Sequence, residues 1–122
     1  MGADRLTPRD IVTLTFPVHQ PPGHEQEGSR PAVIVGVPTG PTRFPVVVVV
    51  PLTTQAREWT DRNPTLYPRL DAGSGGLIRP SVALLDQVRA VDAHRLATYL
   101  GTLSRAAYAP IHRGLSMLFA DL

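Results

Sequence analysis

Residues 44–52 read Phe-Pro-Val-Val-Val-Val-Val-Pro-Leu, and all five positions from 46 to 50 are valine. β-Branched residues favour strands, and an apolar run without polar alternation is typical of a strand that is buried on both faces. Thr53, Thr54 and Gln55 follow at the polar end of the run. The run therefore predicts a buried strand over residues 44–52 that leads into hydroxyl and amide side chains.

Shorter strand patterns lie on both sides of this run. Residues 10–16, Asp-Ile-Val-Thr-Leu-Thr-Phe, alternate so that Val12, Leu14 and Phe16 share one face. Pro17 ends this strand because proline cannot donate to a β-ladder. Apolar runs between turn residues predict further strands over residues 32–37, 65–70, 81–91 and 97–103. Two long loops, residues 17–30 and 56–64, separate them, and Asp92 is placed to cap one helical turn.

The C-terminal segment carries a helical pattern. Apolar side chains recur there at helical spacing and are expected to face the core: Tyr108, Ile111, Leu115, Leu118 and Phe119. The helix has two possible starts, an N-cap at Ser104 or the ring of Pro110, which lacks a backbone donor. Five or six short strands followed by this amphipathic helix predict a mainly-β small barrel with a covering helix, in one domain over residues 1–122.

Composition excludes several classes of protein. The chain has no cysteine, which excludes a disulfide scaffold, an iron–sulfur cluster and a thiolate zinc site. The histidines are not spaced as metal ligands with an acidic partner, so we expect no metal and no cofactor. The longest apolar run cannot cross a bilayer and the N-terminus lacks a signal pattern, so a cytoplasmic protein without membrane contact is expected.

The charge pattern permits a polyanionic partner without proving one. All 12 basic residues are arginine and none is lysine, against 10 acidic residues, for a formal net charge of +2. Genome composition is one explanation of this bias. Whatever its origin, guanidinium groups bind phosphates in a forked geometry and stack on bases, which ammonium groups do not.

Three stretches together resemble the MazF/PemK family of toxins from bacterial toxin–antitoxin pairs. Residues 23–35 read Gly-His-Glu-Gln-Glu-Gly-Ser-Arg-Pro-Ala-Val-Ile-Val, similar to the family's GHEQ-x-G-x-RP pattern. Residues 50–55 read Val-Pro-Leu-Thr-Thr-Gln, and residues 81–96 read Ser-Val-Ala-Leu-Leu-Asp-Gln-Val-Arg-Ala-Val-Asp-Ala-His-Arg-Leu. Each motif alone is weak, but the three occur in the family's order and spacing. The chain departs from the family pattern at Arg9, where a glycine is usual, and in a longer 56–64 loop.

The resemblance implies a fold, an activity and partners. The fold is the SH3-like small barrel of plasmid-maintenance toxins and CcdB, as a two-fold homodimer. The activity is that of a metal-independent, sequence-specific endoribonuclease (an mRNA interferase) that cuts single-stranded RNA by attack of its 2′-hydroxyl. Such enzymes leave a 2′,3′-cyclic phosphate and a 5′-hydroxyl. A cognate MazE-like antitoxin would neutralise the toxin.

The resemblance also assigns catalytic residues. Arg30 matches the arginine of the RP motif and Thr53 the family's catalytic threonine. An arginine is a poor base because its pKa exceeds about 12, but it is a strong clamp for phosphate. We therefore expect Arg30 to stabilise the phosphorane and Thr53 to donate to a non-bridging oxygen. His24, which matches a histidine of the PemK branch, is the best candidate for moving a proton near neutral pH.

Other residues are candidates for binding RNA. Arg57 and Trp59 bring charge and stacking together in one loop, although Trp59 could equally plug that loop onto the core. Gln26 and Gln55 lie in the first and second motifs. Asp86 matches an aspartate of the PemK branch, but the partner arginine of that branch is Leu84 here, so both a structural and a functional role for Asp86 stay open.

Two other functions remain open on the sequence alone. One is a non-enzymatic toxin on the same barrel, of the gyrase-binding CcdB type; the GHEQ and LTTQ motifs disfavour it. The other is a barrel that binds RNA or an antitoxin without cutting. Incubation with single-stranded RNA and a chelator, beside a gyrase assay, separates the three.

Overall fold

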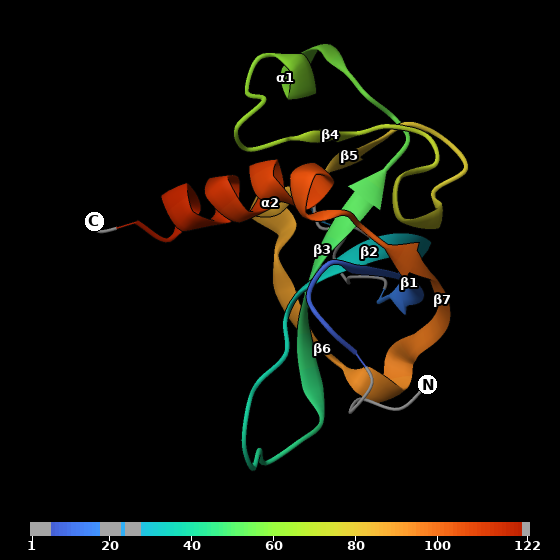
Figure 1. Ribbon diagram of the computed structural model, residues 1–122, viewed down its shortest axis with the longest axis vertical. Helices are drawn as coiled ribbons and strands as arrows, with labels where there is room; N and C mark the ends of the chain where they lie inside the picture. Colours follow the sequence, from blue (N-terminus) through green and yellow to red (C-terminus); the bar gives the residue numbers. More distant parts are fainter. Residues whose placement is uncertain (1–5, 18–22, 24–27, 121–122) are drawn as a thin grey trace.

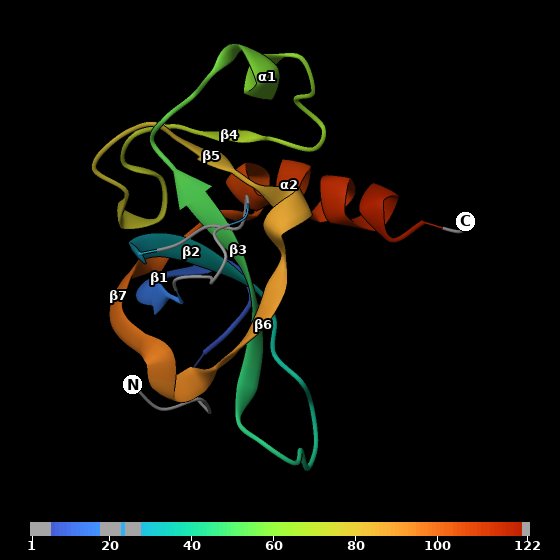
Figure 2. The same cartoon turned by 180° about the vertical axis from the view of Figure 1, so that it is seen from behind.

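The computed structural model describes residues 6–17, 23 and 28–120. The strands of the chain curl around an apolar interior, and one long helix lies against the outside of the curl (Figures 1 and 2). The elements in chain order are β1 (Asp10–Phe16), β2 (Gly28–Gly36), β3 (Val46–Thr53), α1 (Glu58–Asp61), β4 (Arg69–Leu70), η2 (Ser74–Gly76), β5 (Ser81–Ala83), η3 (Leu85–Gln87), β6 (Arg89–Asp92), η4 (Ala93–Arg95), β7 (Leu96–Thr102) and α2 (Arg105–Leu118).

Strand β3 belongs to two parts of the sheet. Its neighbours follow the order β4-β5-β3-β2-β1-β7, and β6 also pairs with β3. The first half of β3 pairs with β6, from Val46 opposite Asp92 to Val49 opposite Arg89. The last two residues pair with β5 instead, with Thr53 opposite Val82. The valine run therefore ends where the curled part of the sheet meets the arm formed by α1, β4 and β5 (Figure 1).

Alternating side chains of the central strands fill two apolar clusters, one on each side of the sheet. The inner cluster lies inside the curl and consists of Leu6, Val12, Leu14, Phe16, Ala32, Ile34, Val47, Val49, Val91 and Leu96. The outer cluster lies under α2 and consists of Ile11, Val33, Val50, Leu52, Leu70, Leu77, Ala83, Leu85, Leu103 and Ile111. Both faces of β3 are thus covered, as a continuous valine run requires.

Helix α2 begins at the first of the two starts that the sequence allowed. The hydroxyl of Ser104 caps it by accepting from the backbone N–H of Ala107 at 3.1 Å. Pro110 lies inside the helix, where burial of Ile111 against the outer cluster outweighs one missing backbone bond. The expected apolar face is wrong at its end, because Leu118 and Phe119 are 38% and 70% exposed. The helix runs past the edge of the cluster there (Figure 1).

Two predicted strands are wrong in extent. The expected strand over residues 81–91 is divided into β5, the turn η3 and β6, because the chain must cross from one end of β3 to the other. The expected strand over residues 65–70 is reduced to β4, since the N–H groups of Leu66 and Tyr67 bond back to Asn63 in a turn. Strand β2 begins at Gly28, inside the predicted loop 17–30.

Other local predictions are confirmed. The strand over residues 10–16 is β1, and the strand predicted over residues 97–103 is β7, shifted by one residue. The predicted turn after Asp92 is η4, and the Asp92 carboxylate accepts from the backbone N–H of His94 at 2.9 Å.

Candidate active site

Arg30 and Thr53 lie just beyond the end of the β2–β3 ladder. On β2 and β3, Ala32 lies opposite Pro51 and Val33 opposite Val50. Arg30 lies two residues beyond this ladder on β2, and Thr53 lies two residues beyond it on β3, where β3 pairs with β5 instead. By alternation both positions continue the inner face, beyond Ala32 and Val49.

Thr53 and its neighbours form a short polar chain at the end of β3. Thr53 is 9% exposed, and its Oγ1 accepts from the backbone N–H of Gln55 at 3.1 Å. This bond uses a lone pair and leaves the hydroxyl proton to be donated elsewhere. The side-chain oxygen of Gln55 in turn accepts from Arg57 Nη2 at 3.2 Å. Thr53, Gln55 and Arg57 therefore lie in one hydrogen-bonded series that starts at the site and runs outwards.

Arg30 enters this end of the sheet from β2. It is half-buried and lies opposite Leu14 of β1. On the same inner face, the guanidinium of Arg89 lies 5.4 Å from the centre of the Phe16 ring. Phe16 lies opposite Gly28, two residues before Arg30 on β2. The inner face thus changes from apolar to cationic at this end of the β1–β2 ladder.

The loop over residues 56–64 contains the single-turn helix α1 and presents Trp59. Thr60 is buried and ties the turn down, accepting from the backbone N–H of Arg57 at 3.1 Å and donating to its carbonyl at 2.6 Å. An ion pair between Glu58 and Arg62 at 2.5 Å spans the same turn. Trp59 remains 46% exposed. The indole therefore lies at the surface rather than plugging the core.

Tyr67 links Trp59 to Asp86. The rings of Trp59 and Tyr67 meet edge to face, with centroids 4.9 Å apart. The Tyr67 hydroxyl donates to Asp86 Oδ2 at 2.7 Å. Burial, then the hydrogen bond to Asp86 and the negative charge of that carboxylate, raise the pKa of Tyr67 to about 12. Tyr67 was not among the candidates predicted from the sequence. The one signal that could have found it is that it is an aromatic residue near Trp59 in the chain.

The described residues thus contain six of the eight predicted site residues, in two groups. Arg30, Thr53, Gln55 and Arg57 lie at the ends of β2 and β3, and Trp59 and Asp86 are joined through Tyr67. The other two, His24 and Gln26, lie outside the described residues.

Neither a metal centre nor a membrane-spanning helix is found in the described part of the chain. No group of three or more histidine, aspartate or glutamate side chains there is arranged to hold a metal ion. Within the same residues, no helix combines the length and apolar character needed to cross a bilayer.

Comparison with known proteins gives a family, a relative and structural neighbours. The model of the family described as PemK-like, MazF-like toxin of type II toxin–antitoxin systems matches residues 7–119. The chain is 35% identical over 74 residues to endoribonuclease EndoA of Bacillus subtilis (strain 168), an alignment that covers 61% of this chain and 61% of EndoA. The chain therefore spans less than two thirds of that relative.

Solved structures resemble the chain over nearly its whole length. MazF from Deinococcus radiodurans has a TM-score of 0.69 at 24% identity, covering 93% of this chain and 94% of that one. An endoribonuclease solved in complex with its cognate antitoxin, from a mycobacterial species, has a TM-score of 0.64 at 20% identity, covering 100% and 99%. At these identities the likeness shows the fold, and the predicted class, a mainly-β curled sheet with a C-terminal helix, is confirmed.

Proposed function

Because the chain belongs to the family of PemK-like, MazF-like toxins of type II toxin–antitoxin systems, we propose that it is a sequence-specific endoribonuclease that cleaves single-stranded mRNA. The observation that carries the proposal is the placement of Arg30 and Thr53. Two motifs far apart in sequence supply a guanidinium and a hydroxyl to strand positions that each lie two residues beyond the end of the β2–β3 ladder. This pair is suited to hold one phosphodiester, since both groups can donate to its oxygens.

The proposed reaction uses the RNA's own 2′-hydroxyl as nucleophile. The 2′-oxygen forms a bond to phosphorus while the bond from phosphorus to the 5′-oxygen breaks. The proton of the 2′-hydroxyl passes to a base, and the leaving 5′-oxygen receives a proton. The products are a 2′,3′-cyclic phosphate and a 5′-hydroxyl. The nucleophile comes from the substrate, so the chemistry needs no metal-activated water, and metal independence is part of the proposal.

Each catalytic residue has a role that suits its chemistry. Arg30 stabilises the added negative charge on phosphorus, and Thr53 donates to a non-bridging oxygen through the proton that its bond to Gln55 leaves available. His24 is the proposed proton carrier, since an imidazole titrates near neutral pH.

Recognition of the RNA is assigned to the residues beside this pair. Gln55 and Arg57 continue outwards from Thr53, and the exposed indole of Trp59 offers a surface on which an unpaired base can stack. Asp86 borders the same region and can accept from a base edge through the lone pairs that Tyr67 does not use. Gln26 is kept as a candidate from the first motif.

The test is cleavage of a long single-stranded RNA in the presence of EDTA, with the cut sites mapped by primer extension. Arg30→Ala and Thr53→Val should each lower the rate about a hundredfold or more, the usual effect of losing one transition-state donor. Arg43→Ala is the matched control, because Arg43 is an exposed arginine stacked on Phe44 in another loop. Wild-type rates for Arg30→Ala would refute the assignment, and loss of all cleavage on chelation would refute metal independence.

The proposed partners follow from the family. We propose that a MazE-like antitoxin neutralises the chain, as the mycobacterial neighbour was solved with its cognate antitoxin. We further propose a homodimer acting in the cytoplasm, with a mass by light scattering of twice the 13.2 kDa of one chain. The family match does not favour the gyrase-binding alternative, and a supercoiling assay with purified gyrase should show no inhibition.

A further inference from the structure

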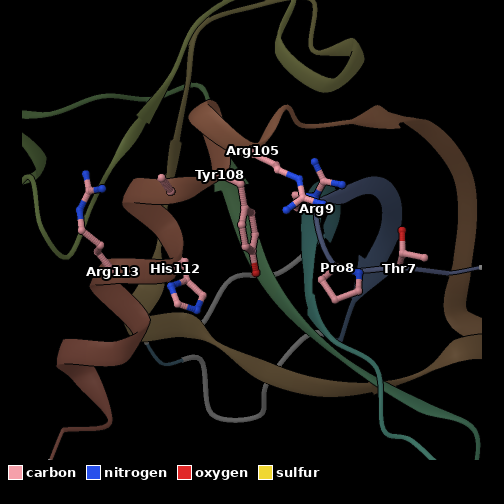
Figure 3. Close-up of a pocket in the computed structure, with 8 residues that line it drawn as sticks. Thr7, Pro8, Arg9, Arg105, Tyr108, His112 and Arg113 are labelled. Carbon is pink, nitrogen blue, oxygen red and sulfur yellow. The ribbon is translucent and has the colours of Figure 1, made fainter.

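A cleft of about 710 Å³ lies between the residues before β1 and helix α2, and its charged side chains are cationic. Figure 3 shows the guanidinium groups of Arg9 and Arg105 side by side near the phenol of Tyr108, with His112 and Arg113 further along the helix. None of the described residues that line it is acidic. The cleft does not include any of the residues proposed above for cleavage.

Arg9 occupies this cleft in a backbone conformation that disfavours any side chain. Its φ is +83°, and it is the one described residue other than glycine with a positive φ. Two backbone bonds hold it there: its N–H donates to Ile34 O, and its carbonyl accepts from Leu103 N, both at 2.8 Å. Glycine would adopt this conformation without strain, so a long cationic side chain here has a cost that its position must offset.

The Arg9 guanidinium is aimed at the helix. Its Nη1 donates to Leu103 O at 3.1 Å, just before α2 begins. Its charge acts on the Tyr108 hydroxyl, whose pKa burial raises and the charge of Arg9 lowers in part. The nearest carboxylate in sequence, Asp10, is buried and accepts hydrogen bonds from Thr7 and Thr102.

Helix α2 adds two more arginines on the same side. His112 and Arg113 follow Arg105 by seven and eight residues, which is about two turns of helix. All three residues line the cleft. Within the described residues, neither Arg105 nor Arg113 has an acidic partner. The guanidinium groups of Arg9 and Arg105, which lie side by side in Figure 3, repel each other, and an anion that bridges them would relieve this repulsion.

We propose that this cleft is a second RNA-binding site, which holds the sugar–phosphate backbone of single-stranded RNA outside the segment that is cut. The inference rests on the proposed function. RNA is favoured over an acidic protein segment because the cleft combines forked phosphate donors with aromatic rings. The rings of Tyr108 and His112 lie 6.5 Å apart at 48°, and Tyr108 is half-buried. They offer faces for bases between the arginines.

The cleft is separate from the proposed cleavage site. Arg9 bonds to Ile34, and Arg30 lies four residues earlier on β2, a distance along the strand of about 13 Å. Helix α2 also covers the outer cluster, whereas Arg30 continues the inner face. The two sites therefore lie on different faces of the sheet, and a strand that occupies both must pass around its edge.

The experiment compares binding of two non-cleavable 2′-O-methyl RNAs, of about 6 and about 20 nucleotides, so that one can fill a single site and the other can extend beyond it. The variants are Arg9→Gly, Arg105→Gln and Arg113→Gln, alone and together, with Arg43→Gln as the matched loss of charge elsewhere. Affinity for the long RNA should fall about fivefold or more in the triple variant. Its slope of log K against log salt should become shallower by about 2, close to 0.7 for each lost phosphate contact on a single strand.

The short RNA and Arg43→Gln separate this site from general electrostatics. The triple variant should lose less affinity for the short RNA than for the long RNA. Arg43→Gln should keep the wild-type ratio of the two affinities. Arg9→Gly should stay folded, because relief of backbone strain offsets loss of the bond to Leu103, and a thermal melt checks this. Equal affinity and equal salt slope in wild type and triple variant would overturn the proposal. The proposal would also be overturned if the triple variant lost binding to polyglutamate but kept its binding to RNA. That result would assign the cleft to an acidic protein segment.

Failure of the proposed function would be visible separately. Binding to a non-cleavable RNA does not require catalysis, so the cleft can be tested whether or not the wild type cuts RNA. A protein that cleaves RNA but shows no cleft-dependent binding keeps the nuclease function and loses this site. A protein that never cleaves, yet shows weaker binding in the triple variant, loses the nuclease function and keeps the site.

Discussion

Tyr67 connects two residues of the proposed recognition surface, Trp59 and Asp86. It meets the edge of Trp59 on the α1 side and donates to Asp86 on the η3 side. A carboxylate that accepts a tyrosine proton at 2.7 Å favours the neutral phenol. The protonated Tyr67 hydroxyl therefore helps to orient the Asp86 carboxylate.

This coupling predicts how Tyr67 titrates. Its pKa is raised from 10.0 to about 12, so the folded state binds the proton more tightly than the unfolded chain. The contribution to stability is complete below the unfolded pKa, and it is lost as the pH rises from there through the folded pKa. A spectrophotometric phenolate titration of wild type minus Tyr67→Phe should show one ionisation near the upper value. Asp86→Asn should move that ionisation to lower pH, and an unmoved midpoint would contradict the assigned partner.

Individual site residues could be predicted from motifs, but their neighbours could not. Arg30 and Thr53 were predicted because each lies in a pattern of several residues, and both lie two residues beyond the end of the β2–β3 ladder. Their catalytic roles stay predictions. The positive φ of Arg9 and the bond from Tyr67 to Asp86 depend on contacts between segments that are distant in the chain. Local residue patterns carry no information about such contacts.

The packing of helix α2 depends on Gly114, although the low helix propensity of glycine predicts that this residue destabilises the helix. Gly114 is buried, and a Cβ built there would lie 2.5 Å from the carbonyl oxygen of Thr65 and 2.3 Å from a methyl group of Leu85. The methyl group can move, but the backbone carbonyl cannot do so cheaply. The missing side chain therefore lets the helix approach the turn after α1 and the turn η3.

Gly114→Ala should accordingly destabilise the protein by about 1–3 kcal/mol, the usual cost of overpacking. Helix propensity by itself predicts the opposite sign, since alanine in place of glycine stabilises a helix by about 1 kcal/mol. Urea denaturation measures the change. Ser116→Ala, at an exposed position of the same helix, reports the propensity effect without the collision. A stabilised Gly114→Ala variant would show that α2 does not pack as closely as the structure has it.

Elements were predictable where one pattern determined them. The alternation over residues 10–16 and the valine run give β1 and β3, because each buries side chains at fixed intervals. The apolar run over residues 81–91 failed because its residues serve different surroundings: Ala83 pairs at the end of β3, Leu85 packs in the outer cluster, and Arg89 pairs nearer the start of β3. A continuous apolar sequence does not reveal that the chain turns within it.

At the scale of the whole molecule, the start of β1 and the end of β7 are tied together beside α2. Asp10 begins β1, lies opposite Thr102 at the end of β7, and is 5% exposed. Its Oδ1 accepts from the Thr102 hydroxyl at 2.7 Å, and its Oδ2 accepts from the backbone N–H of Thr7 at 2.9 Å. The residue that follows β7, Leu103, exchanges hydrogen bonds with Arg9. The edge of the curled sheet is therefore held to the N-terminal turn by a buried carboxylate.

If this carboxylate holds the edge in place, Asp10 and Thr102 should be energetically coupled. Asp10→Ala should cost at least about 2 kcal/mol, because it removes a charged acceptor and leaves partly buried donors unsatisfied. Thr102→Val removes one of those donors. A double-mutant cycle by urea denaturation should give a coupling energy of about 1–2 kcal/mol, within the range for residues that share one bond. The control cycle of Asp10→Ala with Ser116→Ala, which share no hydrogen bond, should be additive within about 0.5 kcal/mol. A coupling energy no larger than in the control cycle would mean that β1 and β7 are held together by their ladder alone. Asp10 would then not be the residue that keeps the neighbouring Arg9 in place beside the cleft.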